Sequence, residues 1–211
     1  MGTEEMKDIC WILAGGPEEA LPCEPVPKDA YILCADSGLR LAERLGIEPA
    51  LVLGDFDSLG RLPHMPYIQA PVEKDDTDTM LAVRYGLGQG YRRFVICGAF
   101  GGRWDHSYAN VQTLLFLHRH GAKGTLVGAT DIITTVAEGE TAVFPHNEGF
   151  SFSVFAISEI CEGVTIQGVK YPLENAPLTI YHPLGVSNAI MADTAVLSCK
   201  KGLLMVVQSR L

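Results

Sequence analysis

Short apolar runs separated by helical patterns fill the first part of the chain. Residues 9–14, 31–35, 50–53 and 93–97 are almost wholly apolar. Runs of this length are typical of strands buried on both faces of a parallel sheet. A further short strand is predicted at residues 67–69, inside a loop that contains three prolines.

Segments with helical spacing lie between these runs. Residues 39–45 place Leu41 and Leu45 on one face, and Gly46 follows where a C-terminal cap belongs. A second helix is predicted from about residue 76, with core positions at Met80, Val83 and Leu87. A third helix, closed near residue 121, is predicted to have one core face: Val111, Leu114, Leu115 and His118.

The pattern changes after residue 124, where helical spacing gives way to short strand-like runs separated by turn residues. These runs are residues 132–136, 141–144, 150–155, 164–169, 178–180, 194–198 and 203–207. Their spacing is typical of a β-sandwich or a β-barrel. We therefore predict an α/β N-terminal domain, residues 1–124, with a Rossmann-like open parallel sheet. An all-β domain, expected to be a sandwich, follows at residues 125–211.

Composition narrows the class of protein. The 211 residues are 47% hydrophobic and 19% charged, with a net charge of −9. A globular protein with no nucleic-acid partner is expected, because a basic binding surface is unlikely at this charge. The six cysteines form no CxxC pair and are predicted to be buried free thiols. The acidic start and the short apolar runs predict a cytoplasmic protein without a signal peptide or membrane span.

Residues 54–58, Gly-Asp-Phe-Asp-Ser, are the strongest candidate for chemistry. If this stretch continues the preceding strand, Asp55 and Asp57 project to one side and Phe56 to the other. Two carboxylates this close need a cation or a shared proton between them, and a divalent metal is the usual solution. The alternative is an acidic surface turn without a ligand.

Other polar clusters also follow strands or begin helices. They contain Asp36, then Lys74 with Asp75 and Asp78, and then Arg103 with Asp105 and His106. In an open α/β sheet the ligand crevice lies at the carboxyl ends of the strands, so these clusters should meet at one edge. Acidic clusters suit Mg²⁺, and an arginine in a glycine-rich loop before a helix suits phosphate. A Walker A motif and a nucleophile elbow are both missing.

Taken together, these motifs resemble the thiamine pyrophosphokinase family. The resemblance rests on Gly-Asp-Phe-Asp-Ser at 54–58, Lys-Asp-x-Thr-Asp at 74–78 and Gly-Gly-Arg-x-Asp-His at 101–106. Segments at 168–173 and 185–188 extend it into the second domain. It implies an α/β nucleotide domain, a β-sandwich and a homodimer with its sites at the subunit interface. It also implies Mg²⁺-dependent transfer of a pyrophosphoryl group from ATP to the hydroxyl of thiamine, releasing AMP.

The resemblance assigns roles to individual residues. By the resemblance, the metal and the triphosphate would be held by Asp55, Asp57 and Asp78. The catalytic acidic cluster is Asp55, Asp57, Asp75 and Asp78, with Asp75 or Asp78 orienting the hydroxyl or taking its proton. By the resemblance, the nucleotide would be bound by Asp36, Lys74, Arg103, Asp105 and His106, and thiamine by Ser187 and Asn188.

The sequence departs from the family pattern in two places. Ser37 follows Asp36 where the family often has glycine, and Ala189 and Ile190 follow Asn188 where many bacterial members have an acidic and an aromatic residue. The second departure bears on the thiamine side of the site. Two alternatives therefore stand beside the main reading: transfer to a different hydroxymethyl heterocycle, or a non-catalytic nucleotide or thiamine sensor.

Overall fold

The computed structural model describes residues 9–17 and 21–211, and the chain forms two compact units. The first unit ends at Thr130 and the second begins at Asp131. The sequence-based boundary after residue 124 falls inside a strand of the first unit, β6 (Lys123–Val127).

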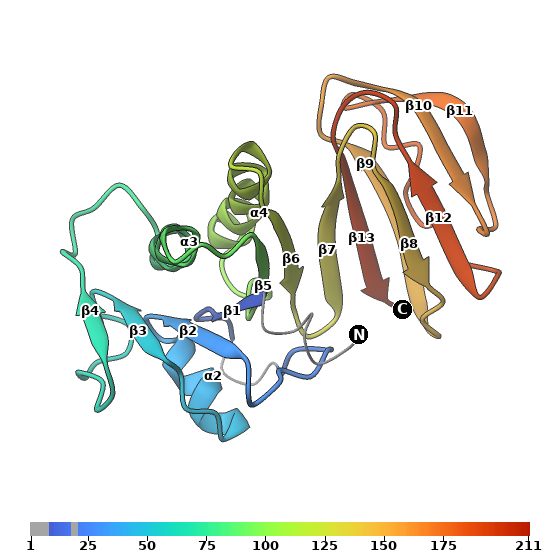
Figure 1. Cartoon of the computed structure of the whole chain (residues 1–211). Helices are drawn as coiled ribbons and strands as arrows, with labels where there is room; N and C mark the ends of the chain where they lie inside the picture. Colours follow the sequence, from blue (N-terminus) through green and yellow to red (C-terminus); the bar gives the residue numbers. More distant parts are fainter. Residues whose placement is uncertain (1–8, 18–20) are drawn as a thin grey trace. The chain divides into compact units, whose positions relative to one another are not determined.

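The first unit is built around a parallel sheet. Its strands are β1 (Ile9–Leu13), β2 (Tyr31–Ala35), β3 (Leu51–Gly54), β4 (Tyr67–Gln69), β5 (Arg93–Cys97) and β6. They lie in the order β4-β3-β2-β1-β5-β6, and each neighbouring pair is parallel. Strands β1, β2 and β3 are almost completely buried, as their apolar sequences predict. The predicted open parallel sheet is confirmed (Figure 1).

Helices α2 (Gly38–Leu45), α3 (Asp78–Gly88) and α4 (Trp104–Arg119) pack on this sheet. The predicted cap of α2 is confirmed, because Gly46 has φ 64° and its N–H reaches the last carbonyls of the helix. The predicted face of α4 is only partly right. Leu114 is buried, but His118 is exposed, and the other buried positions are Ser107, Asn110, Thr113 and Leu117.

Strand β6 was not predicted, because glycine and threonine interrupt its apolar pattern. The structure gives the reason for the glycine. A Cβ at Gly124 would lie 2.6 Å from Leu114 Cδ2 and 2.7 Å from Leu117 Cδ1. The small residue therefore lets α4 lie close to the sheet, and tertiary packing overrides the weak strand propensity of glycine.

The second unit consists of antiparallel strands. They are β7 (Asp131–Val136), β8 (Thr141–Pro145), β9 (Phe150–Ala156), β10 (Ile160–Gln167), β11 (Leu173–Thr179), β12 (Thr194–Ser198) and β13 (Leu204–Arg210). Strand β13 pairs with β7 on one side and with β9 on the other, so these three strands belong to one sheet. The remaining strands form a second sheet in the order β11-β10-β12-β8. Both sheets contribute to one core, which contains Phe152, Val154, Val164, Ile166, Ala195, Leu197, Leu204 and Val206. This shared core confirms the predicted β-sandwich.

All six cysteines are free thiols, as predicted, and all except Cys23 are buried. Burial raises the pKa of Cys10 and of Cys97 to about 12, which keeps both thiols protonated and unreactive. Within residues 9–17 and 21–211, no helix combines the length and the apolar composition needed to cross a membrane.

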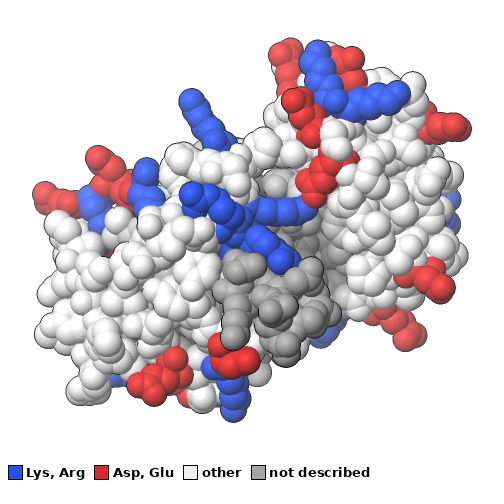
Figure 2. All heavy atoms as spheres, in the orientation of Figure 1, with Lys and Arg blue, Asp and Glu red and all other residues white. Residues whose placement is uncertain are grey.

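Charges of both signs lie among large uncharged areas on the face of the molecule seen in Figure 2.

Candidate active site

The strand order of the first unit reverses direction at β1. The chain runs outward from β1 to β4 and then returns to β5 on the other side of β1. Loops that leave adjacent strands in opposite directions open a crevice at the carboxyl ends of those strands. A cavity of about 280 Å³ lies there, and its walls include Gly15 and Gly16 after β1 and Gly98 and Ala99 after β5.

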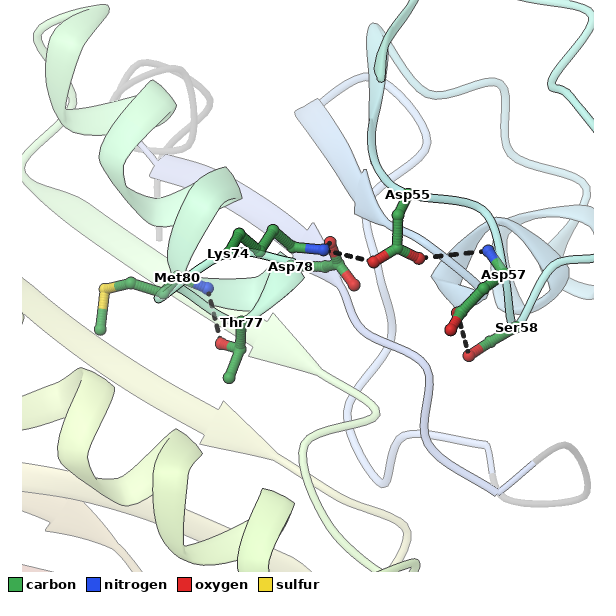
Figure 3. A network of polar contacts seen from close by, with 7 residues as sticks. All are labelled: Asp55, Asp57, Ser58, Lys74, Thr77, Asp78 and Met80. Carbon is green, nitrogen blue, oxygen red and sulfur yellow. Dashed lines mark hydrogen bonds and ion pairs between the residues drawn. The ribbon is translucent and has the colours of Figure 1, made fainter. Parts of the chain in front are cut away.

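Asp55 and Asp57 lie in a turn that follows β3, so the condition that this stretch continues the strand is not met. Phe56 has φ 66°, which places its backbone in the left-handed region. The Asp57 N–H donates to Asp55 Oδ1 (3.1 Å), and the Ser58 hydroxyl donates to Asp57 Oδ1 (3.0 Å), as Figure 3 shows. Phe56 itself is buried and packs edge-on against Tyr67. The turn therefore brings the two carboxylates together while Phe56 anchors it to the core.

Asp36 joins these two residues from the end of β2. It is only 5% exposed, and its Oδ1 has no hydrogen-bond partner within the part of the chain that the structure describes. One oxygen from each of Asp36, Asp55 and Asp57 lies within 4.8 Å of the other two. We call these three residues the acidic triad. Carboxylates this close repel one another unless a cation lies among them, so this donor set fits a hard divalent ion such as Mg²⁺.

Gly54 makes the approach of Asp36 possible. A Cβ on Gly54 would lie 2.9 Å from Asp36 Cβ and 3.0 Å from its Cα. Any larger residue would push β3 and the end of β2 apart. The glycine at the start of the motif therefore sets the spacing of the acidic triad.

Lys74 lies beside the acidic triad, between two carboxylates. Its Nζ forms an ion pair with Asp55 Oδ2 and lies 3.1 Å from Asp78 Oδ1. The hydrogen bond from Lys74 lowers the pKa of Asp55. Burial lowers the pKa of Lys74, but its bonds to the two carboxylates outweigh that effect and raise the pKa overall. Burial raises the pKa of Asp78 by more than Lys74 offsets.

The last residue of the segment 74–78, Asp78, is the first residue of α3. Thr77 is the N-cap residue, and its side chain accepts the Met80 N–H at 3.2 Å. This cap fixes where the helix begins and so directs Asp78 toward Lys74 (Figure 3). Asp75 is exposed, and Asp76 pairs with Arg84 at 2.7 Å. The structure thus groups Asp78 with Lys74 and leaves Asp75 at the surface.

Arg103, Asp105 and His106 lie at the N-terminus of α4. Both oxygens of Asp105 bind the Arg103 guanidinium, at 3.1 and 2.5 Å, and Asp105 Oδ1 also accepts the His106 N–H. The arginine lowers the pKa of Asp105. Arg103 and His106 line the 280 Å³ cavity, together with Ser58 from the turn. A guanidinium at a helix N-terminus beside a cavity is suited to bind phosphate oxygens.

Sequence reasoning missed several polar residues of this cavity, among them Thr79, Ser107 and Asn110. Asn110 is buried, and its Nδ2 donates to Ala99 O at 2.9 Å, which ties α4 to the loop after β5. The signal for Asn110 was an asparagine inside a predicted helix, because a buried amide side chain needs a hydrogen-bond partner. It was overlooked because the helix face was assigned from apolar positions alone.

The second unit has a cavity of its own, of about 240 Å³, with Tyr171, Leu173, Leu184, Val186 and Asn188 in its walls. Its tyrosine comes from the segment before β11, and its asparagine from the loop before β12. The lining is mainly apolar, which is typical of a small-molecule site.

Asn188 is buried, and its amide binds mainly protein backbone. Its Oδ1 accepts the Tyr171 and Ala189 N–H groups at 3.0 and 2.9 Å, and its Nδ2 donates to Tyr171 O at 2.8 Å. The side chain therefore positions the Tyr171 segment at the cavity. Ser187 is exposed with φ 57°, and Ile190, which departs from the family pattern, is buried in the sandwich core.

Comparison with known proteins identifies the family of the chain. The family model described as "Thiamin pyrophosphokinase, catalytic domain" matches residues 25–126, and "Thiamin pyrophosphokinase, vitamin B1 binding domain" matches residues 141–204. A curated thiamine pyrophosphokinase of Bacillus subtilis is 30% identical over 209 residues, covering 94% of this chain and 97% of its own length. The chain belongs to the thiamine pyrophosphokinase family. It is therefore an enzyme of the transferase class.

Solved structures of the thiamine pyrophosphokinase family have the same fold. A crystal structure of thiamine pyrophosphokinase from Bacillus subtilis matches with a TM-score of 0.87 at 28% identity, covering 96% of this chain and 99% of the other. One from Geobacillus thermodenitrificans matches with a TM-score of 0.82 at 28% identity, covering 96% and 98%. The order of an α/β unit and a β-sandwich is thus a property of the family.

Proposed function

We propose that this chain transfers a pyrophosphoryl group from ATP to the hydroxyl of thiamine, giving thiamine diphosphate and AMP, with Mg²⁺ as the required metal. The observation that carries this proposal is the acidic triad next to a cavity lined by Arg103. Such a site combines ligands for a divalent cation with a donor for phosphate oxygens, which is what phosphoryl-type transfer asks of a protein.

Asp36, Asp55 and Asp57 would hold Mg²⁺. The buried Oδ1 of Asp36, which has no hydrogen-bond partner among the described residues, supports its inclusion. The family resemblance also assigns Asp78 to the metal, and Asp78 Oδ1 lies 3.1 Å from Lys74 Nζ. When bound, the metal neutralises the charge of the triphosphate and aligns it for attack. The residues themselves supply fixed oxygen donors, which reduces the rearrangement needed on binding.

The triphosphate would lie in the cavity between the turn at Ser58 and the start of α4. Asp105 binds the Nε and Nη2 groups of Arg103 and so orients the guanidinium, whose remaining N–H donors would bind the triphosphate oxygens. His106 lines the same wall and would donate a hydrogen bond. Arg103 is 74% exposed as a side chain, so a bound nucleotide can reach it without displacing the protein core.

A carboxylate at the start of α3 would orient the thiamine hydroxyl. We assign this role to Asp78, because Lys74 and the Thr77 cap hold it in position, with Asp75 as the other candidate. Thiamine itself would contact Ser187 and the cavity of the second unit. Asn188 would act there through the Tyr171 segment. The net charge of −9 favours a substrate with a cationic thiazolium ring.

The test is to incubate the purified protein with ATP, Mg²⁺ and thiamine and to separate the products by chromatography. We expect thiamine diphosphate and AMP in equal amounts, and no turnover in the presence of EDTA. Formation of ADP and thiamine monophosphate would contradict pyrophosphoryl transfer. Preferred turnover of another hydroxymethyl heterocycle would contradict thiamine as the substrate.

We also propose that the chain acts as a homodimer. The second unit carries large exposed apolar side chains, including Tyr171, Tyr181 and Met191. Surfaces of this kind are often covered by a second subunit. Light scattering at micromolar concentration should give about twice the chain mass of 22.8 kDa, and a mass near 22.8 kDa would contradict the dimer.

A further inference from the structure

Lys74 is held more tightly than a surface lysine. Its side chain is 14% exposed, and the side chain of Asp55, which it contacts, is 8% exposed. The residue lies in the loop that enters α3, four positions before Asp78, so one ammonium group meets carboxylates from two different segments (Figure 3). Ion pairs shielded from water in this way are stronger than exposed pairs.

The contacts of Asp55 divide the carboxylates into two groups. Asp55 Oδ2 faces Lys74, while Asp55 Oδ1 accepts the Asp57 N–H within the turn. One group is the acidic triad, and the other is Asp55 and Asp78 on either side of Lys74. Asp55 therefore belongs to both, and its side chain is oriented from both sides.

Without Lys74, Asp55 and Asp78 would be two carboxylates facing a common point with no cation between them. Paired carboxylates of this kind bind divalent cations or take up a proton. The lysine ammonium occupies the position where such a cation would bind. We propose that Lys74 is a built-in cation that orients Asp55 and Asp78 and excludes a second divalent ion from the space between them.

This role rests on the proposed function of the acidic triad as the magnesium site. A covalently attached ammonium is present at every Mg²⁺ concentration. It holds Asp55 oriented toward the acidic triad in the absence of the metal. Lys74 is therefore a positioning residue, and its removal should change how many divalent ions the protein binds.

The experiment counts Mn²⁺ ions bound to the nucleotide-free protein, using the electron paramagnetic resonance signal of free Mn²⁺. Lys74→Met removes the charge but keeps an unbranched side chain of similar length. Arg84→Met is the matched control, because Arg84 pairs with Asp76 outside the acidic triad. At about 1 mM free Mn²⁺ we expect Lys74→Met to bind one more ion per chain than wild type, and Arg84→Met to match wild type.

Thermal unfolding gives a second, independent reading if Lys74→Met is poorly folded. In EDTA the variant should melt below wild type, because Asp55 and Asp78 repel each other. Added Mg²⁺ should raise its melting temperature by more than that of wild type or Arg84→Met, since the ion replaces the lost ammonium. Equal Mn²⁺ counts in wild type and Lys74→Met, with no extra stabilisation by Mg²⁺, would overturn the proposal.

The outcome is separable from that of the proposed function. The Mn²⁺ count and the melting temperature need neither ATP nor thiamine. Failure of the wild-type enzyme to form thiamine diphosphate would overturn the proposed reaction and leave the role of Lys74 standing. Normal turnover together with unchanged Mn²⁺ counts would overturn only the role of Lys74.

Discussion

Replacing Asp57 with asparagine removes one negative charge from the acidic triad and hardly changes the volume of the side chain. The hydrogen bond from Ser58 survives, because the asparagine carbonyl can still accept it. The Asp57 N–H bond to Asp55 belongs to the backbone and also survives. The substitution therefore isolates the charge.

The effect on stability can be estimated from the geometry. The triad oxygens lie within 4.8 Å of one another. At that separation two unit charges repel by about 3.5 kcal/mol at an effective dielectric of ~20 and by about 0.9 kcal/mol in water. Asp57 is exposed, so the lower value applies. The free energy of unfolding of Asp57→Asn should stay level or rise by up to about 1 kcal/mol.

The effect on catalysis should be much larger. Mg²⁺ prefers a carboxylate to a neutral amide, so the metal would bind weakly or out of place. Loss of a central electrostatic contact costs about 3–4 kcal/mol of barrier, or roughly a hundredfold to a thousandfold in kcat. The assay is AMP formation at saturating ATP and thiamine, repeated at increasing Mg²⁺, which should restore activity only in part.

Asp76→Asn is the matched control, because it makes the same chemical change at a residue that pairs with Arg84 away from the acidic triad. It should keep activity within about threefold of wild type. If Asp57→Asn also kept activity within about threefold at saturating Mg²⁺, the motif would be an ordinary surface turn. The assignment of the metal site would then be wrong.

Three further outcomes follow from the geometry. Gly54→Ala should lower the free energy of unfolding by about 1–3 kcal/mol, measured in urea, because its Cβ would clash with Asp36. Asn188→Ala should raise the KM for thiamine about tenfold with little change in kcat, since it releases the loop that lines the second cavity; an unchanged KM would contradict this role. The stability difference between wild type and Lys74→Met, measured without metal, should be flat from about pH 5 to pH 9. It should shrink as the pH falls below the ordinary aspartate value of about 4 toward the lowered pKa of Asp55, and as the pH rises above about 10 toward the raised pKa of Lys74; a steady decline across pH 5–9 would contradict the ion pair.

The sequence by itself determined the class of the fold and the edge of the sheet at which the proposed site lies. Apolar runs of strand length, such as residues 31–35 and 93–97, predict buried parallel strands because only the interior of an α/β sheet covers both faces. The motifs at 54–58, 74–78 and 101–106 follow strands or begin helices, so the carboxyl edge of the sheet was predictable. These features are local, and short stretches of sequence are enough to specify them.

Only the tertiary structure decided which groups meet. The turn at Phe56 depends on a left-handed backbone conformation that the sequence does not reveal. The acidic triad forms because Asp36, from the end of β2, lies close to Asp55 and Asp57. The ion pair between Lys74 and Asp78 likewise appears only in the folded chain. The buried face of α4 likewise follows the sheet that it packs on, and it includes the polar Asn110. Sequence patterns report the polarity of each residue, but the partner of a buried carboxylate or amide is set by long-range packing.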